Sequence, residues 1–168
     1  MLWFDWMTLG IVLVVAVVET IRARNSGGFG QALFDALGLV IAALGSTWLA
    51  GPIADTLGAA KWVITLVAFA ILAVGALAGA RTVFSAFEWS SDSFDGGLSF
   101  LFGVACGWVI ANMVLRIIVL KQGDIGEVAM MMPNAPVARE VFQFRTWNIL
   151  MNRFFKLNLG PRIDLDVG

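Results

Sequence analysis

Long apolar runs separated by short polar segments dominate the first 120 residues of the chain. A spanning helix needs about 20 mostly apolar residues, and four windows meet this length: Leu2–Ile21, about Gly30–Pro52, Trp62–Ala80 and Leu98–Leu120. The runs are uninterrupted, whereas the strands of a membrane barrel would alternate at every second residue. The pattern therefore predicts an all-α integral membrane protein, with a four-helix transmembrane domain over residues 1–120.

The segments between the windows have the composition of turns. Arg22–Gly28 combines charge with Asn, Ser and Gly, which is typical of a tight polar turn. In the second connection we expect Gly51-Pro52 to end the helix, because proline cannot continue it. Four tryptophans would then lie at one membrane interface as an aromatic belt: Trp3, Trp6, Trp48 and Trp62. Trp108 falls in the middle of a window, and we expect it inside the bundle.

The chain changes character after residue 120. Residues 121–136 are punctuated by Gly and Pro and are predicted to form a linker. Residues 137–157 have helical spacing, which predicts an amphipathic interfacial helix on the lipid surface; the alternative is a helix packed on the bundle or on a neighbouring subunit. Its two faces are an apolar one (Val141, Phe144, Trp147, Met151, Phe154, Phe155) and a polar, basic one (Arg145, Asn148, Asn152, Arg153, Lys156). Residues 158–168 are predicted to be a flexible tail.

Composition supports lipid as the surrounding medium and narrows the chemistry. Hydrophobic residues make up 60% of the 168 residues and charged residues only 14%, against about 25% charged in soluble domains. The net charge of −1 gives no electrostatic footprint for nucleic acid. Cys106 is the only cysteine, so an internal disulfide and a cysteine-cluster metal site are excluded. The absence of histidine removes the usual general base and the commonest metal ligand, so we expect neither a zinc site nor an ordinary hydrolytic triad. We therefore predict no cofactor, no metal and no enzymatic activity.

The basic residues predict an orientation. The first residues, MLWFDWMTLG, contain no lysine or arginine, so we expect a retained membrane segment rather than a signal peptide. Arg22 and Arg24 in the first connection place that connection in the cytoplasm by the positive-inside rule. With four spans, both termini then lie on the outer face. Lys61 and Lys121 argue in the opposite direction.

Small residues recur at intervals of four, which places them on one face of a helix. Such ladders allow close helix packing in lipid, either within one chain or between copies, so a homo-oligomer is a further expectation. The three ladders are Ser99, Gly103, Gly107 and Ala111; Gly38, Ala42, Ser46 and Ala50; and the shorter pair Gly75 and Gly79.

Three polar residues inside the windows form a candidate intramembrane polar site, because such groups are costly in lipid. Asp35 either faces a polar crevice, titrates there, or bonds the first turn of its own helix. Asn112 lies deeper in its window, and Arg116 is close enough to the end of the same window to reach the headgroups as an anchor. Glu19 is spaced to pair with Arg22 at i,i+3.

The segment FDGGLSFLFGVACG, which enters the last window, resembles the corresponding segment of the colicin V production protein family. Asp95, Phe102, Gly103 and Gly107 match that pattern, whereas Gly96 and Cys106 stand where the family usually has arginines. Any role of those arginines is therefore not carried over.

Two further stretches add to the resemblance. WFDW is similar to the start of the family, with Asp5 at the corresponding place, and GGFGQAL is similar to its RGF.REAL pattern through Gly28 and Phe29. The likeness covers roughly residues 3–52 and 94–120 and the aromatic tail. It implies a bacterial inner-membrane protein with four spans and no established catalytic activity, which supports toxin (bacteriocin) production or secretion and envelope homeostasis.

A different class of function is also consistent with the sequence. Glycine-faced helices around a path lined by Asp35 or Asn112 would form a subunit of an oligomeric channel or pore. The two classes differ in one structural respect: a pore would turn both residues towards a shared axis, whereas a scaffold would satisfy them within one subunit. An enzyme is the least favoured class, because no positioned base and partner stand out.

Overall fold

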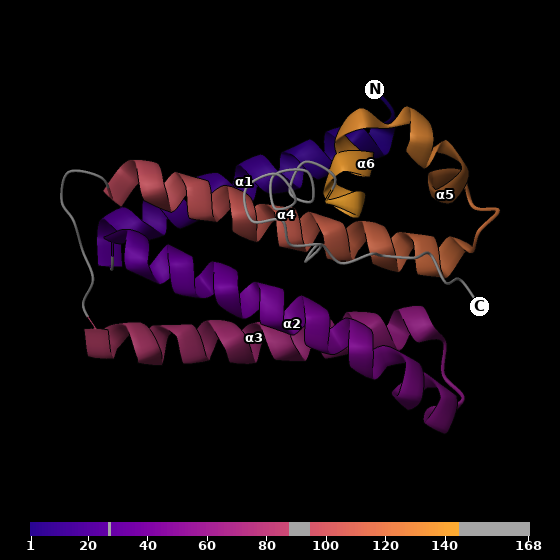
Figure 1. Ribbon diagram of the computed structural model, residues 1–168, viewed down its shortest axis with the longest axis horizontal. Helices are drawn as coiled ribbons and strands as arrows, with labels where there is room; N and C mark the ends of the chain where they lie inside the picture. The colour runs from indigo at the N-terminus through magenta and orange to yellow at the C-terminus, as the bar shows by residue number, and fades with distance from the viewer. Residues whose placement is uncertain (27, 88–94, 145–168) are drawn as a thin grey trace, which may run out of the picture.

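The computed structural model describes residues 1–26, 28–87 and 95–144. Four long helices lie side by side, and two short helices cover one end of the bundle (Figure 1). The long helices are α1 (Trp3–Ser26), α2 (Gly28–Leu57), α3 (Lys61–Phe87) and α4 (Asp95–Gln122). They are followed by α5 (Glu127–Met131), the 3₁₀ helix η1 (Met132–Asn134) and α6 (Pro136–Gln143). These ranges contain no strand, so the predicted all-α class is confirmed for the described chain.

The four long helices form two antiparallel pairs. α1 packs along α4, α2 packs along α3, and the two pairs meet where α2 contacts α4 (Figure 1). Gly107 of α4 faces Val12 of α1, and Gly103 one turn earlier faces Ala16, which gives the pair its antiparallel register. α5, η1 and α6 fold back onto α1 and α4 at the end of the bundle that holds the N-terminus.

All four long helices are long and apolar enough to cross a bilayer: Trp3–Ala23, Gly28–Leu57, Lys61–Val83 and Gly96–Gln122. Large apolar side chains stand exposed along the outward faces of the bundle, among them Val14, Val17, Ile41, Leu44, Ile71 and Val74. In water such a surface would greatly exceed the apolar patches that monomeric proteins tolerate. In lipid it is solvated, so the chain is a multi-pass membrane protein.

The predicted end of the second helix was wrong. α2 continues through Pro52 to Leu57. The helix ends at Leu57 because the next residue, Gly58, has a left-handed φ of +62°, and the N–H of Ala59 donates to the carbonyl of Ala54 at 3.2 Å. Glycine adopts this conformation without the steric cost that a Cβ would add. The proline therefore lies inside the last turns of α2 and does not mark its end.

The first connection is shorter than predicted. α1 runs to Ser26, and Gly28, with a φ of +63°, already begins α2. Arg22 and Arg24 therefore belong to the last turns of α1 and not to a loop. The Arg22 side chain uses this position to reach two carboxylates inside the bundle.

The predicted linker, residues 121–136, contains helical structure. α4 ends at Gln122, and the next residue, Gly123, has a φ of +73° and donates its N–H to the carbonyl of Val119 at 2.9 Å. α5 and η1 follow at once, and their buried side chains Val128 and Met132 join the apolar core between α1, α4 and α6. Burial of these two side chains explains why the segment folds onto the bundle.

The predicted amphipathic helix over residues 137–157 is not confirmed as one continuous helix. α6 ends at Gln143, and Phe144 has a left-handed backbone with a φ of +50°. The apolar face of α6, including Val141, packs on the bundle, which agrees with the alternative of a bundle-packed helix. Residues 145–157 lie outside the described chain.

Candidate functional site

A buried carboxylate holds the beginning of α6. Asp5, in the first turn of α1, accepts the backbone N–H groups of Val137 and Ala138 through Oδ1 at 3.1 and 2.9 Å. Its Oδ2 accepts the N–H of Leu2 at 3.1 Å. The N–H groups of the first helical turn have no partner within the helix, and a negative charge at this end is favoured by the helix dipole. Asp5 is therefore fully satisfied although its side chain is completely buried.

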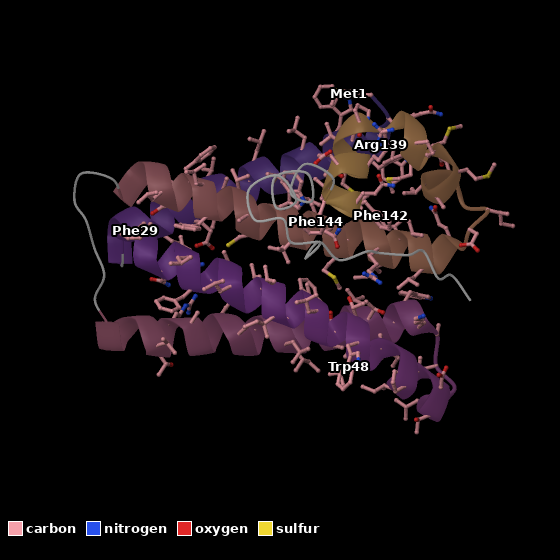
Figure 2. The ribbon with its side chains drawn as sticks, in the orientation of Figure 1. Met1, Phe29, Trp48, Arg139, Phe142 and Phe144 are labelled. Atoms are coloured by element: carbon pink, nitrogen blue, oxygen red, sulfur yellow. The ribbon has the colours of Figure 1, made fainter. Side chains whose placement is uncertain are left out.

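Two side chains of α4 hold the other end of α6. Nδ2 of Asn112 donates to the carbonyls of Val141 and Phe142 at 3.0 and 3.2 Å, and Nε1 of Trp108 donates to the carbonyl of Val141 at 3.2 Å. In a longer helix the carbonyl of Val141 would instead accept the N–H four residues later. The two α4 side chains therefore bond a carbonyl in the last turn of α6, and the left-handed backbone of Phe144 ends the helix at this point. Figure 2 shows Phe142 and Phe144 beside α4 at this point.

We call Asp5, Trp108 and Asn112 the α6 clamp. Together they supply partners to both ends of α6 from the two helices on which it packs. Asn112 lies ten residues before the end of α4 at Gln122, which corresponds to about 15 Å along the helix axis. The clamp thus reaches well into the span. The unpaired backbone groups at the ends of a short helix at such a depth require partners within the protein, and the clamp provides several of them.

A second polar cluster lies at the opposite end of the bundle, between α1 and α2. Nη1 of Arg22 contacts Oε1 of Glu19 at 2.6 Å, and Nη2 contacts Oδ2 of Asp35 at 3.3 Å. We call these three residues the charge cluster. The Asp35 side chain is completely buried, and within the described ranges neither of its oxygens accepts a hydrogen bond. The ion pair with Arg22 is therefore the one direct polar contact of this carboxylate among the described residues.

The surroundings of the charge cluster come from α4. A Cβ placed on Gly103 would lie 3.1 Å from Cβ of Glu19, so the glycine lets the two helices approach at this point. Ser99, one turn earlier on the same face, is buried, and its Oγ has no hydrogen-bond partner in the part of the chain that the structure describes. Cys106 is buried, with Sγ 4.0 Å from the carbonyl of Ala32 on α2. The cluster is thus enclosed by small or weakly polar groups.

Two of the three small-residue ladders pack within the chain. A Cβ on Gly107 would lie 2.7 Å from Cα of Val12, which only a glycine permits. In the second ladder, a Cβ on Gly38 would lie 3.2 Å from Cβ of Ala76 on α3, and the remaining members Ala42, Ser46 and Ala50 are buried. The third ladder differs, because a Cβ on Gly75 or Gly79 would meet nothing within 4 Å. These two glycines face outwards.

The other predicted residues lie apart from one another. Arg116 is half-buried and forms neither a hydrogen bond nor an ion pair with the part of the chain that the structure describes. Among the residues that match the family pattern, Asp5 belongs to the α6 clamp, whereas Gly28, Phe29 and Asp95 lie at the end of the charge cluster. Figure 2 shows Phe29 at the end of the bundle opposite to Met1 and Arg139.

The structure separates the three members of the predicted intramembrane polar site. Asn112 forms hydrogen bonds with the backbone of α6, and Asp35 forms an ion pair with Arg22. Arg116 takes part in neither of these contacts. Sequence reasoning did not identify the partnership of Asp5 with α6 or that of Trp108 with Val141. One signal was present for each: a carboxylate in the first turn of an apolar helix, and a tryptophan one turn before an asparagine in another.

Within the described residues, no group of three or more His, Cys, Asp or Glu side chains is placed to hold a metal ion. Comparison of the chain with protein-family models, with curated proteins and with solved structures gave no match. The fold and its lipid-facing surface therefore define the class: a multi-pass α-helical membrane protein with a short helix clamped into one end of its bundle.

Proposed function

We propose that this protein is a non-enzymatic scaffold of the bacterial inner membrane that supports toxin (bacteriocin) production or secretion and envelope homeostasis. The resemblance of its segments around Asp5, Phe29 and Gly103 to the colicin V production family supplies the biological context. The observation that favours a scaffold is the α6 clamp, in which the Asp5 carboxylate and the side-chain N–H groups of Asn112 bond the backbone of α6 within one chain. A residue engaged in this way is not available to line a path for solutes.

The positions of the polar groups add support for a scaffold. Asn112 contacts α6 at one end of the bundle, whereas Asp35 lies at the other end and contacts Arg22 on α1. A pore subunit would present both residues to a common axis. The α6 clamp also gives the scaffold a rigid end, and this is the part of the molecule that we assign to contacts with other envelope components.

An oligomeric channel is the second candidate, and one observation favours it. Both oxygens of Asp35 and the hydroxyl of Ser99 are buried without hydrogen-bond partners among residues 1–26, 28–87 and 95–144, a state that few buried polar atoms in native proteins show. A channel in which the helices at this end of the bundle rearranged between subunits would place such groups next to a shared path.

Conductance measurements on the purified full-length protein in planar bilayers test the choice between the two candidates. If the protein is a scaffold, we expect no unitary conductance from the wild type and none from Asp35→Asn. A conductance that Asp35→Asn alters would overturn the scaffold and support the channel. Deletion of the gene tests the cellular role: we expect greater sensitivity to detergent and reduced toxin release, restored by the wild-type gene, and an unchanged phenotype would refute that role.

The placement in the cell follows from the same proposal. We assign the chain to the inner membrane with both termini on the outer face, because Arg22 and Arg24 lie at the opposite end of the bundle from Trp3. We further propose a homo-oligomer in the bilayer. Native mass spectrometry of the detergent-solubilised protein measures copy number directly, and a monomer at all concentrations would contradict this assignment.

A further inference from the structure

The charge cluster contains more negative than positive groups in direct contact. Arg22 is the one guanidinium, and it is shared between two carboxylates, Glu19 at 2.6 Å and Asp35 at 3.3 Å. Exposure of the side chains falls from 28% for Arg22 to 10% for Glu19 and 0% for Asp35. The shorter contact thus goes to the more exposed carboxylate, and the fully enclosed one keeps the longer contact.

Charged and titratable groups on the neighbouring helices do not supply a second positive charge in direct contact with the charge cluster. Arg81 of α3 attracts Asp35 electrostatically, but its side chain is exposed and forms no ion pair with any described residue. Glu19 of α1 repels Asp35. Cys106 of α4 is the remaining titratable neighbour, and its Sγ is directed to the carbonyl of Ala32. None of these groups donates a hydrogen bond to the Asp35 carboxylate.

The buried oxygens of this region therefore lack hydrogen-bond partners among the described residues. Oδ1 and Oδ2 of Asp35 and Oγ of Ser99 are enclosed without such a bond, and the ion pair of Oδ2 with Arg22 is the one polar contact found there. A charge buried in a bundle that lipid surrounds is costly unless it is both paired and hydrogen-bonded. An enclosed carboxylate of this kind is stabilised by a positive ligand small enough to enter a packed interior.

We propose that the Asp35 carboxylate is the binding site of a small monovalent cation, a proton or Na⁺. A proton would form an O–H bond on one carboxylate oxygen and neutralise the charge. Na⁺ would take the same oxygen as a direct ligand and leave the carboxylate ionised. Either cation would bind the carboxylate oxygens of Asp35 and supply the second positive charge that balances the two carboxylates of the charge cluster. Binding of this kind requires no conduction, so it goes beyond the scaffold and does not depend on it.

Infrared spectroscopy of the full-length protein in lipid vesicles tests the proposal. Wild type and Asp35→Asn are compared at mildly acidic and mildly alkaline pH, with choline or Na⁺ as the buffer cation. The matched control is Asp55→Asn on the same helix, because Asp55 is exposed. A carbonyl band of a protonated acid that Asp35→Asn removes and Asp55→Asn retains identifies the proton. A carboxylate band that shifts when Na⁺ replaces choline, again lost only in Asp35→Asn, identifies Na⁺.

One result would overturn the site: an Asp35 carboxylate band that responds neither to pH nor to Na⁺. A second measurement removes the dependence on variant folding. Carbon-13 NMR of the wild-type protein with labelled aspartate reports the protonation and ion contacts of the buried carboxyl directly, and a resonance that stays constant under both changes would equally overturn the proposal. Because neither measurement detects current, failure of the site leaves the bilayer test of the scaffold unaffected.

Discussion

The carboxylate of Asp5 accepts the backbone N–H of Ala138 at 2.9 Å, across 133 positions of the sequence. This bond joins the first turn of α1 to the first turn of α6. At the other end of α6, the side-chain amide of Asn112 donates to carbonyls in the last turn of the helix. The sequence alone did not predict this contact. A helix of eight residues is too short to be stable by itself in water, so its structure depends on these contacts and on the core beneath it.

Replacement of Asp5 tests the first half of the α6 clamp. Asp5→Ala removes a charged acceptor from three backbone N–H groups. Hydrogen bonds to charged groups contribute about 1.5–3 kcal/mol each, and we expect a loss of at least about 2 kcal/mol in the free energy of unfolding in detergent micelles. Hydrogen exchange of the α6 amides should accelerate at the same time.

The matched control for this prediction is Asp55→Ala. Asp55 is exposed near the end of α2, and surface substitutions usually change stability by less than about 0.5 kcal/mol. Equal effects of the two variants would show that the contact of Asp5 with α6 contributes nothing specific.

The second half of the α6 clamp is tested by removing its donors one at a time. Trp108→Phe keeps an aromatic ring but deletes the N–H that reaches Val141, whereas Asn112→Leu deletes both bonds of the amide. We expect a loss of about 1 kcal/mol for the tryptophan variant and about 1–3 kcal/mol for the asparagine variant. Unfolding in micelles measures both, and an Asn112→Leu protein as stable as wild type would contradict the clamp.

Glycine packing between α1 and α4 gives a third prediction with an internal control. In Gly107→Ala the new Cβ would lie 2.7 Å from Cα of Val12, a backbone atom that moves only with its helix. Overpacking of this kind costs about 1–3 kcal/mol. Gly75→Ala meets no atom within 4 Å and should leave stability unchanged or raise it by up to about 1 kcal/mol, because alanine is the better helix former.

Thermal unfolding in detergent separates these two glycine variants. If Gly75→Ala proves as damaging as Gly107→Ala, the outward face of α3 is covered by another molecule, and the lipid-facing assignment of that ladder is wrong.

The four spans could be predicted from the sequence because lipid imposes a minimum length of apolar residues, and runs such as the one before Arg22 and the one that begins at Trp62 reach it. The exact ends of the helices could not be predicted, because they depend on the backbone conformation of single glycines. Gly58 and Gly123 adopt left-handed backbones that end α2 and α4, whereas Pro52, the stronger signal in the sequence, lies within a helix.

The fourth prediction concerns Arg22 and Asp35, whose side chains meet at 3.3 Å. A double-mutant cycle of Arg22→Gln and Asp35→Asn isolates their interaction, and residues in direct contact typically show coupling of about 0.5–3 kcal/mol. We expect Arg22→Gln alone to be more damaging than the double variant, because it leaves two buried carboxylates without their cation. Additive effects, measured by unfolding in micelles, would contradict a direct pair.

The candidate sites were harder to predict from the sequence than the membrane-spanning helices. Glu19 and Arg22 are neighbours on one helix, so spacing alone predicted their pair, which the structure confirms at 2.6 Å. Contacts between distant segments have no such local signal. The bond from Asn112 to Val141 depends on α6 folding back onto α4, and the amphipathic pattern of residues 137–157 indicated instead a helix that runs past Phe144.

Cysteine labelling of intact cells tests the four-span arrangement most directly. In a Cys106→Ser background, single cysteines at Ala60, in the turn between α2 and α3, and at Ile125, after α4, lie at the same end of the bundle, whereas Asn25 lies at the other. We predict that a membrane-impermeant maleimide labels Ala60→Cys and Ile125→Cys from outside and labels Asn25→Cys only after the membrane is opened. Labelling of Ala60→Cys and Ile125→Cys from opposite sides would contradict the account.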